Sequence, residues 1–87
     1  MMIQRLAAPV SVDFISDHKT RRVLPRSLCW DGRVHPITKI GLHHTYRQGR
    51  TLFHVFSVLA QTIYFRLRLD TDTLFWQLEE ISDGLPD

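Results

Sequence analysis

A two-residue alternation between residues 62 and 70 constrains this chain more than any other feature. Every second residue of this stretch is apolar, the apolar set being Ile63, Phe65, Leu67 and Leu69. Successive side chains of a β-strand point to opposite faces, so this pattern predicts a strand with one buried face and one face in water. Dense apolar sequence surrounds it from Leu52 to Ser82 and predicts three consecutive antiparallel strands, with the alternating strand in the middle.

Turns at 60–61 and 71–72 would align the large apolar side chains of these three strands on one face. Phe56 would then lie opposite Phe65, and Leu67 opposite Trp76. A slip of one residue would move every apolar side chain to the solvent face, so the face is strongly specified.

The third segment, residues 72–83, has an alternative interpretation. Asp72 could cap a helix in which Leu74, Leu78 and Ile81 share a face. The hairpin alignment and the preceding β-branched and aromatic residues favour the strand.

The rest of the chain also reads as short strands and turns. Residues 10–16 alternate and predict a first strand, and the polar, basic residues 17–22 predict an exposed loop. A hairpin is expected over 24–40, because Asp31-Gly32 suits the two positive-φ positions of a type I′ turn.

Two prolines and two glycines indicate how that hairpin is placed. Pro25 and Pro36 lack a backbone donor, so each belongs at a strand start, an edge or a bulge. Residues 41–49, enclosed by two glycines, predict a connection or a short irregular strand. The expected fold is all-β, a small antiparallel barrel or rolled sheet of about six strands.

Length and composition indicate a single small domain of 87 residues. We expect a flexible leader over 1–9, the all-β domain over 10–83 and a frayed C-terminus over 84–87. A single cysteine, Cys29, excludes an internal disulfide and fits a reducing compartment. No signal-peptide-like or membrane-spanning apolar run is present, so we expect a cytoplasmic protein without a membrane partner.

Charge is distributed unevenly along the chain. Residues 1–68 carry all 11 Lys and Arg residues and three acids, a net charge of +8, whereas 69–87 carry six acids and no base, a net charge of −6. This asymmetry permits a basic surface for polyanions. Alternatively, the opposite charges pair across the surface of the sheet.

The segment Trp30-Asp31-Gly32-Arg33, together with Phe65-Arg66-Leu67 and Trp76-Gln77-Leu78, resembles a family of small bacterial domains of unknown function. The family pattern is a Trp-x-Gly-Arg hairpin followed by further strands and a late Trp-x-Leu. Some members are appended to proteins similar to translesion DNA polymerases. The resemblance covers residues 10–82 and implies an all-β accessory module without assigning an activity.

The histidines and the cysteine do not form a recognisable catalytic or metal motif. The five histidines lack a close zinc-ligand spacing, and His43 and His44 would point to opposite faces of a strand. Cys29 and His35 would lie near each other across the hairpin, but no orienting carboxylate or oxyanion donor accompanies them. Glu79 and Glu80 should point to opposite faces. We therefore expect no catalytic residue, metal or cofactor, and a non-enzymatic protein.

The basic residues are the best functional lead. Single-strand-binding barrels combine a cationic groove with aromatic stacking platforms. The candidate nucleic-acid-binding residues are Lys19, Arg21, Arg22, Arg26, Tyr46, Arg47, Tyr64, Arg66 and Arg68. Alternatively, these residues form an ordinary solvated face, with Arg68 packed on Phe75.

We expect the partner to be single-stranded nucleic acid or a DNA-processing protein. A second hypothesis is a protein-interaction module or homodimer that pairs an exposed strand edge, with Phe53, Val55 and Phe75 at the contact. A weaker third hypothesis is a metal-binding protein or hydrolase.

Overall fold

The computed structural model describes residues 3–83, all of whose regular structure is β-strand. The strands are β1 (Ile3–Asp17), β2 (Arg22–Trp30), β3 (Arg33–Pro36), β4 (Lys39–Gln48), β5 (Thr51–Ala60), β6 (Ile63–Asp70) and β7 (Phe75–Ser82). The predicted all-β class is confirmed. The described chain has seven strands rather than about six, because residues 41–48, expected as a connection or a short irregular strand, belong to the ten-residue strand β4.

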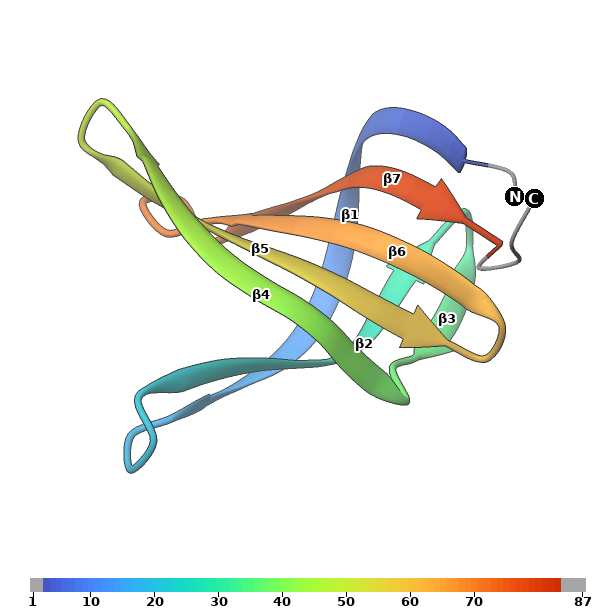
Figure 1. Cartoon of the computed structure of the whole chain (residues 1–87), viewed down its shortest axis with the longest axis horizontal. Coiled ribbons are helices and arrows are strands. Elements are labelled where there is room, and N and C mark those ends of the chain that lie inside the picture. Colours follow the sequence, from blue (N-terminus) through green and yellow to red (C-terminus); the bar gives the residue numbers. More distant parts are fainter. Residues whose placement is uncertain (1–2, 84–87) are drawn as a thin grey trace.

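The strands form one antiparallel sheet in the order β3-β2-β1-β7-β6-β5-β4, curled into a half-barrel (Figure 1). The long strand β1 pairs with β7 through residues 3–10 and with β2 through residues 11–17. The two edge strands, β3 and β4, are joined by residues 37–38. Ile37 donates its N–H to the Arg26 carbonyl and Thr38 donates to the Leu59 carbonyl, so this link fastens β2 to β5 at one end of the half-barrel.

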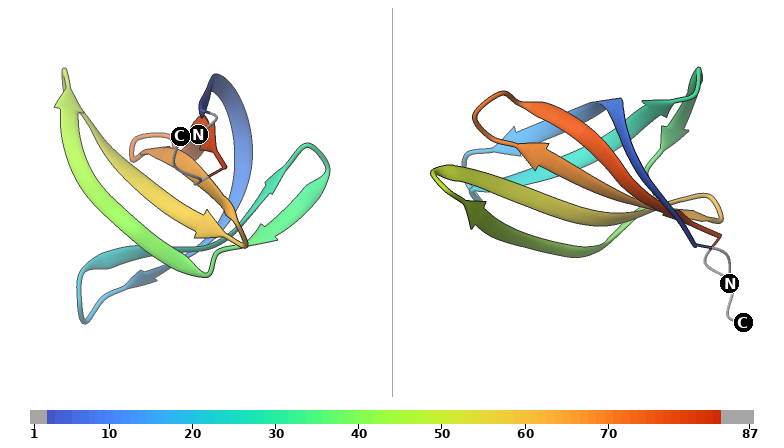
Figure 2. Two further views of the ribbon diagram at one scale, coloured as in Figure 1. Left: turned by 45° about the vertical axis from the view of Figure 1, so that its right-hand side comes forward. Right: turned by 90° about the horizontal axis from the view of Figure 1, so that it is seen from above.

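At the other end, the β1–β2 hairpin and the β4–β5 hairpin diverge from each other (Figures 1 and 2). We call the end of each hairpin an arm: residues 15–24 form the first arm and residues 45–54 the second. The turn of the first arm has Arg21 at φ 58°, and the turn of the second has Gly49 at φ 63°. Both arms extend from the same side of the core.

The core lies on the inner face of the curled sheet and follows the predicted alternation. Its fully buried side chains come from β2, β5, β6 and β7; the largest are Phe56, Phe65, Leu28, Leu67, Leu69, Leu78 and Val58. Burial of each such side chain contributes about 1.5–3 kcal/mol relative to its exposure. Leu28 comes from β2. Because β2 pairs with the second half of β1, it lies over the inner face of the other core strands.

The predicted registers are wrong by two residues, although the buried face is right. The β5–β6 turn lies at 61–62 rather than 60–61, with Gln61 at φ 58°. Phe56 therefore lies opposite Leu67, not opposite Phe65. Because side chains alternate with period two, an even shift leaves the same residues in the core.

A four-residue turn at 71–74 causes the shift between β6 and β7. Asp70 Oδ1 accepts hydrogen bonds from the N–H groups of Asp72 (2.8 Å) and Thr73 (3.3 Å), and the N–H of Leu74 donates to the carbonyl of Asp70 (2.7 Å). Leu74 takes a φ of 63° and is exposed. The helix considered for residues 72–83 is therefore absent, and the strand prediction is confirmed.

The predicted leader is part of the sheet in its described portion. Residues 3–9 form the first half of β1, with Ile3 opposite Ser82 and Pro9 opposite Gln77. This pairing covers an edge of β7 that would otherwise be open to other chains. Residues 1–2, and the C-terminus expected to fray at 84–87, lie outside the described residues.

The Asp31-Gly32 hairpin is confirmed. Both residues have positive φ, 54° and 73°, and Trp30 pairs with Arg33 across the turn. Pro36 lies on the edge strand β3, and Pro25 lies beside a bulge between β1 and β2, as a residue without a backbone donor requires. Within residues 3–83 there is no helix long and apolar enough to cross a membrane.

Replacing Phe65 with alanine should lower the free energy of unfolding by about 3–5 kcal/mol, because its fully buried ring would leave a cavity. Urea denaturation measures the loss. Tyr64→Ala, on the opposite face of the same strand, is the matched control and should cost much less. Equal losses at the two positions would contradict the assigned faces.

Gly32 should tolerate asparagine better than valine. A Cβ at Gly32 meets no atom within 4 Å, so the difference comes from its φ of +73° alone. A left-handed conformation costs an ordinary L-residue roughly 1–2 kcal/mol, and Asn adopts it more readily than a β-branched residue. Thermal melting of the two variants tests this, and identical melting temperatures would rule out strain at this turn.

Candidate nucleic-acid interface

The structure divides the candidate nucleic-acid-binding residues between two surfaces. Tyr46, Tyr64, Arg66 and Arg68 lie together on the outer face of β4 and β6. Lys19, Arg21 and Arg22 lie on the first arm and Arg47 on the second. Arg26 lies on β2, exposed, outside both groups. The single basic face expected from the sequence is therefore two separate groups.

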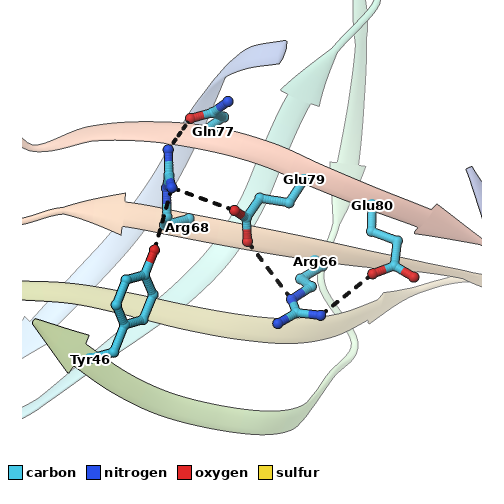
Figure 3. A network of polar contacts seen from close by, with 6 residues as sticks. All are labelled: Tyr46, Arg66, Arg68, Gln77, Glu79 and Glu80. Carbon is cyan, nitrogen blue, oxygen red and sulfur yellow. Dashed lines mark hydrogen bonds and ion pairs between the residues drawn. The ribbon is translucent and has the colours of Figure 1, made fainter. Parts of the chain in front are cut away.

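Arg68 is the centre of a polar network on the outer face (Figure 3). It donates hydrogen bonds to the hydroxyl of Tyr46 (3.3 Å) and to Oε1 of Gln77, and its Nη1 lies 3.6 Å from Glu79 Oε2. Its guanidinium carbon also lies 4.9 Å from the ring centroid of Phe53. The predicted packing of Arg68 on Phe75 is wrong, because the β6–β7 register places Gln77 opposite Arg68 and Phe75 opposite Asp70.

Arg66 completes the network through two glutamates. Its guanidinium lies 3.8 Å from Glu79 Oε1 and 3.5 Å from Glu80 Oε2 (Figure 3). The prediction that Glu79 and Glu80 point to opposite faces is wrong, since the β6–β7 register shifts between Arg66 and Leu67. A bulge places two residues of one strand against one of its partner and breaks the alternation. The two arginines are thus neutralised by two carboxylates.

The rest of the outer face is more closely packed than the sequence indicated. Tyr46 stacks on Phe53, with ring centroids 5.1 Å apart and planes 19° from parallel. Val55, expected to be an exposed contact residue, is 2% exposed and lies between His44 and Arg68 in the sheet. Of the three proposed outer-face contact residues, Phe75 alone is exposed, at 75%.

The arms carry cations that are differently placed. Their Lys and Arg residues are Lys19, Arg21 and Arg22 on the first arm and Arg47 and Arg50 on the second. All of these side chains are exposed, and within residues 3–83 none of them forms an ion pair. The acid of the first arm, Asp17, accepts a hydrogen bond from the backbone N–H of Lys19 (2.9 Å), which shapes the turn. The arms are therefore basic and open to solvent.

A row of rings crosses the inner face of the sheet from one arm to the other. It consists of Phe14 on β1, Trp76 on β7, Phe56 on β5 and His43 on β4, with successive centroids 5.6, 5.7 and 4.2 Å apart. Trp76 and Phe56 are buried, whereas Phe14 is partly exposed and His43 exposed. The indole N–H of Trp76 is buried without a hydrogen-bond partner in the described chain. The accessible ends of this aromatic row thus lie at the bases of the two arms.

His43 and His54 form a hydrogen-bonded pair beside this row. His43 Nε2 lies 2.8 Å from His54 Nδ1, and the two ring planes are 20° from parallel with centroids 5.0 Å apart. On β6, the residue opposite His54 is Leu69. Burial lowers the pKa of both histidines. His54, Arg22 of the first arm and His44 lower the pKa of His43 further.

Cys29 and His35 do not form a catalytic pair. Cys29 is exposed and pairs with Val34 across the hairpin, whereas His35 pairs with Leu28 and packs 5.1 Å from the ring centroid of Phe65. Adjacent positions on a strand face opposite ways, so the predicted placement of the imidazole beside the thiol is wrong. In the part of the chain that the structure describes, no three His, Cys, Asp or Glu side chains converge as metal ligands would.

The glutamate bulge was missed by sequence reasoning, but a signal for it exists. The inward-facing residues of β7 are Trp76, Leu78 and Ile81, and their spacing changes from two residues to three. A strand that keeps one face in the core can lengthen its spacing in this way only by inserting an extra residue. The irregular spacing therefore marks the bulge at Glu79.

Comparison with known proteins adds no assignment. No protein-family model matches the chain, and no curated protein or solved structure matches it either.

The histidine pair should make folding stability depend on pH. Both pKa values lie below the ordinary 6.5, so the unfolded chain binds more protons than the folded chain at mildly acidic pH. The contribution of the pair should be complete above about pH 6.5 and decline as the pH falls below that value. Urea titrations between pH 7.5 and 5 in wild type and in His43→Gln/His54→Gln measure it. An equally steep decline in the double variant would contradict this assignment.

Proposed function

We propose that this protein is a non-enzymatic module that binds single-stranded nucleic acid between its two basic arms, alone or together with a DNA-processing partner. The observation that carries the proposal is the contrast between its two groups of cations. Arg66 and Arg68 are neutralised by glutamates, whereas the arm cations are exposed and unpaired within residues 3–83. Phosphate contacts require cations of the second kind.

The aromatic row supports a single strand rather than a duplex as the ligand. In a duplex the faces of the bases are stacked inside the helix, whereas a single strand can lay them on protein rings. Phe14 and His43 offer partly exposed rings at the bases of the arms. Cations on the arms would follow the phosphate backbone on either side of these rings.

The resemblance of the Trp30–Arg33 hairpin to small bacterial domains attached to translesion-polymerase-like proteins points to DNA as the nucleic acid. The single cysteine supports a location in the reducing cytoplasm.

Exchanging one cation on each arm should weaken binding and reduce its salt dependence. In Arg21→Gln/Arg47→Gln the slope of log affinity against log salt, measured with fluorescent oligo(dT) by polarisation, should flatten by about 1.4, since each single-strand phosphate contact contributes about 0.7. Thermal stability should change little, because exposed charges contribute little to it.

Arg33→Gln/Lys39→Gln is the matched control, since it removes two exposed cations that lie outside the arms. Its salt slope should equal that of wild type. Equal slopes in both double variants would reject the arms as the binding surface. A wild-type protein that binds neither DNA nor RNA at low salt would reject nucleic-acid binding altogether.

A further inference from the structure

The outer edge of β4 is the longer of the two open edges of the sheet in residues 3–83. β4 is the last strand in the sheet order, and it pairs with β5 on one side from Lys39 to Gln48. In the described part of the chain no strand pairs with its other side. Alternate residues of an edge strand direct their backbone N–H and C=O groups away from the sheet, where they can pair with another strand.

The other edge strand, β3, shows how an edge is normally protected. β3 has four residues and ends in Pro36, so it offers few backbone donors to a partner. β4 has ten residues and no proline, and its bulge lies near its start, between Ile40 and Leu42. Residues 42–48 therefore form a regular open edge of about the length of an average strand.

The side chains of β4 determine which kind of strand fits this edge. β4 contains no acidic residue; Lys39 lies near one end and Arg47 near the other. Opposite charges on neighbouring strands stabilise a sheet and like charges destabilise it. A second copy of β4 is disfavoured, because it would bring the same two cations and no acid to this edge. Charge therefore favours an acidic partner strand.

The outer face of β4 adds two apolar contact positions. Leu42 is 67% exposed and Tyr46 36% exposed, on the same face of the strand. Tyr46 is held in place by the hydrogen bond from Arg68 and by its stack on Phe53. A contact that is already ordered loses less conformational entropy when a partner binds.

We propose that the edge of β4 binds an extended acidic segment of another protein, which adds an eighth strand to the sheet. The backbone of residues 42–48 forms the hydrogen bonds, and Leu42 and Tyr46 contact apolar side chains on one face of the incoming strand. Acidic side chains on the other face of that strand lie beside Arg47, and Lys39 adds a positive charge beyond the bulge. This is strand addition at an open edge, with affinity from the backbone and selectivity from alternate side chains.

A short synthetic peptide of alternating glutamate and valine tests the proposal on the intact protein. Its binding should slow hydrogen exchange of the amides in residues 42–48 and leave those of β3 unchanged. The same peptide with N-methyl groups on alternate residues keeps every charge but loses the backbone donors, and it should bind at least tenfold more weakly. If the two peptides bind with equal affinity, the backbone donors do not contribute and charge alone explains the binding, which would overturn strand addition.

Two further comparisons separate this surface from the others. Lys39→Glu/Arg47→Glu should lose affinity for the glutamate peptide at least tenfold and gain affinity for a lysine–valine peptide. Arg21→Gln/Arg22→Gln leaves β4 untouched, so it should weaken oligo(dT) binding without affecting the peptide. A glutamate peptide that protects no β4 amide would overturn the proposal. So would a free protein that is a dimer by light scattering and whose residues 42–48 are already protected, and in that case the occupant of the edge is a second copy.

Discussion

The curled sheet depends on the division of β1 between two neighbours. Its first half continues the β4–β7 meander beside β7, and its second half turns away to pair with β2. This brings Leu28 into the core formed mainly by β5, β6 and β7. The bend is accommodated at two register shifts, between Arg5 and Ala8 and between Asp13 and Phe14, where bulges increase the local twist. With one straight partner for β1, the sheet would stay open and Leu28 would be exposed.

The same division of β1 creates the arms. Beyond Val10, β1 and β7 no longer pair, so the β1–β2 hairpin leaves the core in one direction while the β4–β5 hairpin leaves in another (Figure 2). Each arm is held by its own ladder and by the core at its base. Exposed cations are tolerated on such extensions because solvent and salt screen their mutual repulsion. A polyanion bound between the arms would contact these cations near the bases of the arms, where Phe14 and His43 lie.

Sequence reasoning was accurate where the physical determinants are local. The alternation around Phe65 and the turn at Gly32 depend on neighbouring residues, and both predictions are confirmed. The register of two paired strands depends on the length of the turn between them. Between β6 and β7 this length is set by hydrogen bonds to Asp70, which composition does not reveal. Pairing of residues 3–9 with β7 is a long-range contact, and β4 shows little alternation because nearly all of its side chains are exposed. The arm cations other than Arg50 were among the predicted binding residues, but their separation from Arg66 and Arg68 required the three-dimensional arrangement.

The uneven charge along the chain is only partly balanced by contacts between acids and bases within the described fold. Glu79 and Glu80 pair with arginines of β6, while Asp70 and Asp72 accept hydrogen bonds in and around the β6–β7 turn. Asp72 accepts its hydrogen bond from Thr51 of the second arm, but within residues 3–83 none of these acids forms an ion pair with an arm cation. Both proposed surfaces therefore attract negative partners, and Arg47 belongs to both of them. An acidic strand on β4 would bring carboxylates to the base of the second arm and weaken its hold on phosphate, so the two partners should compete through charge without overlapping along their whole length.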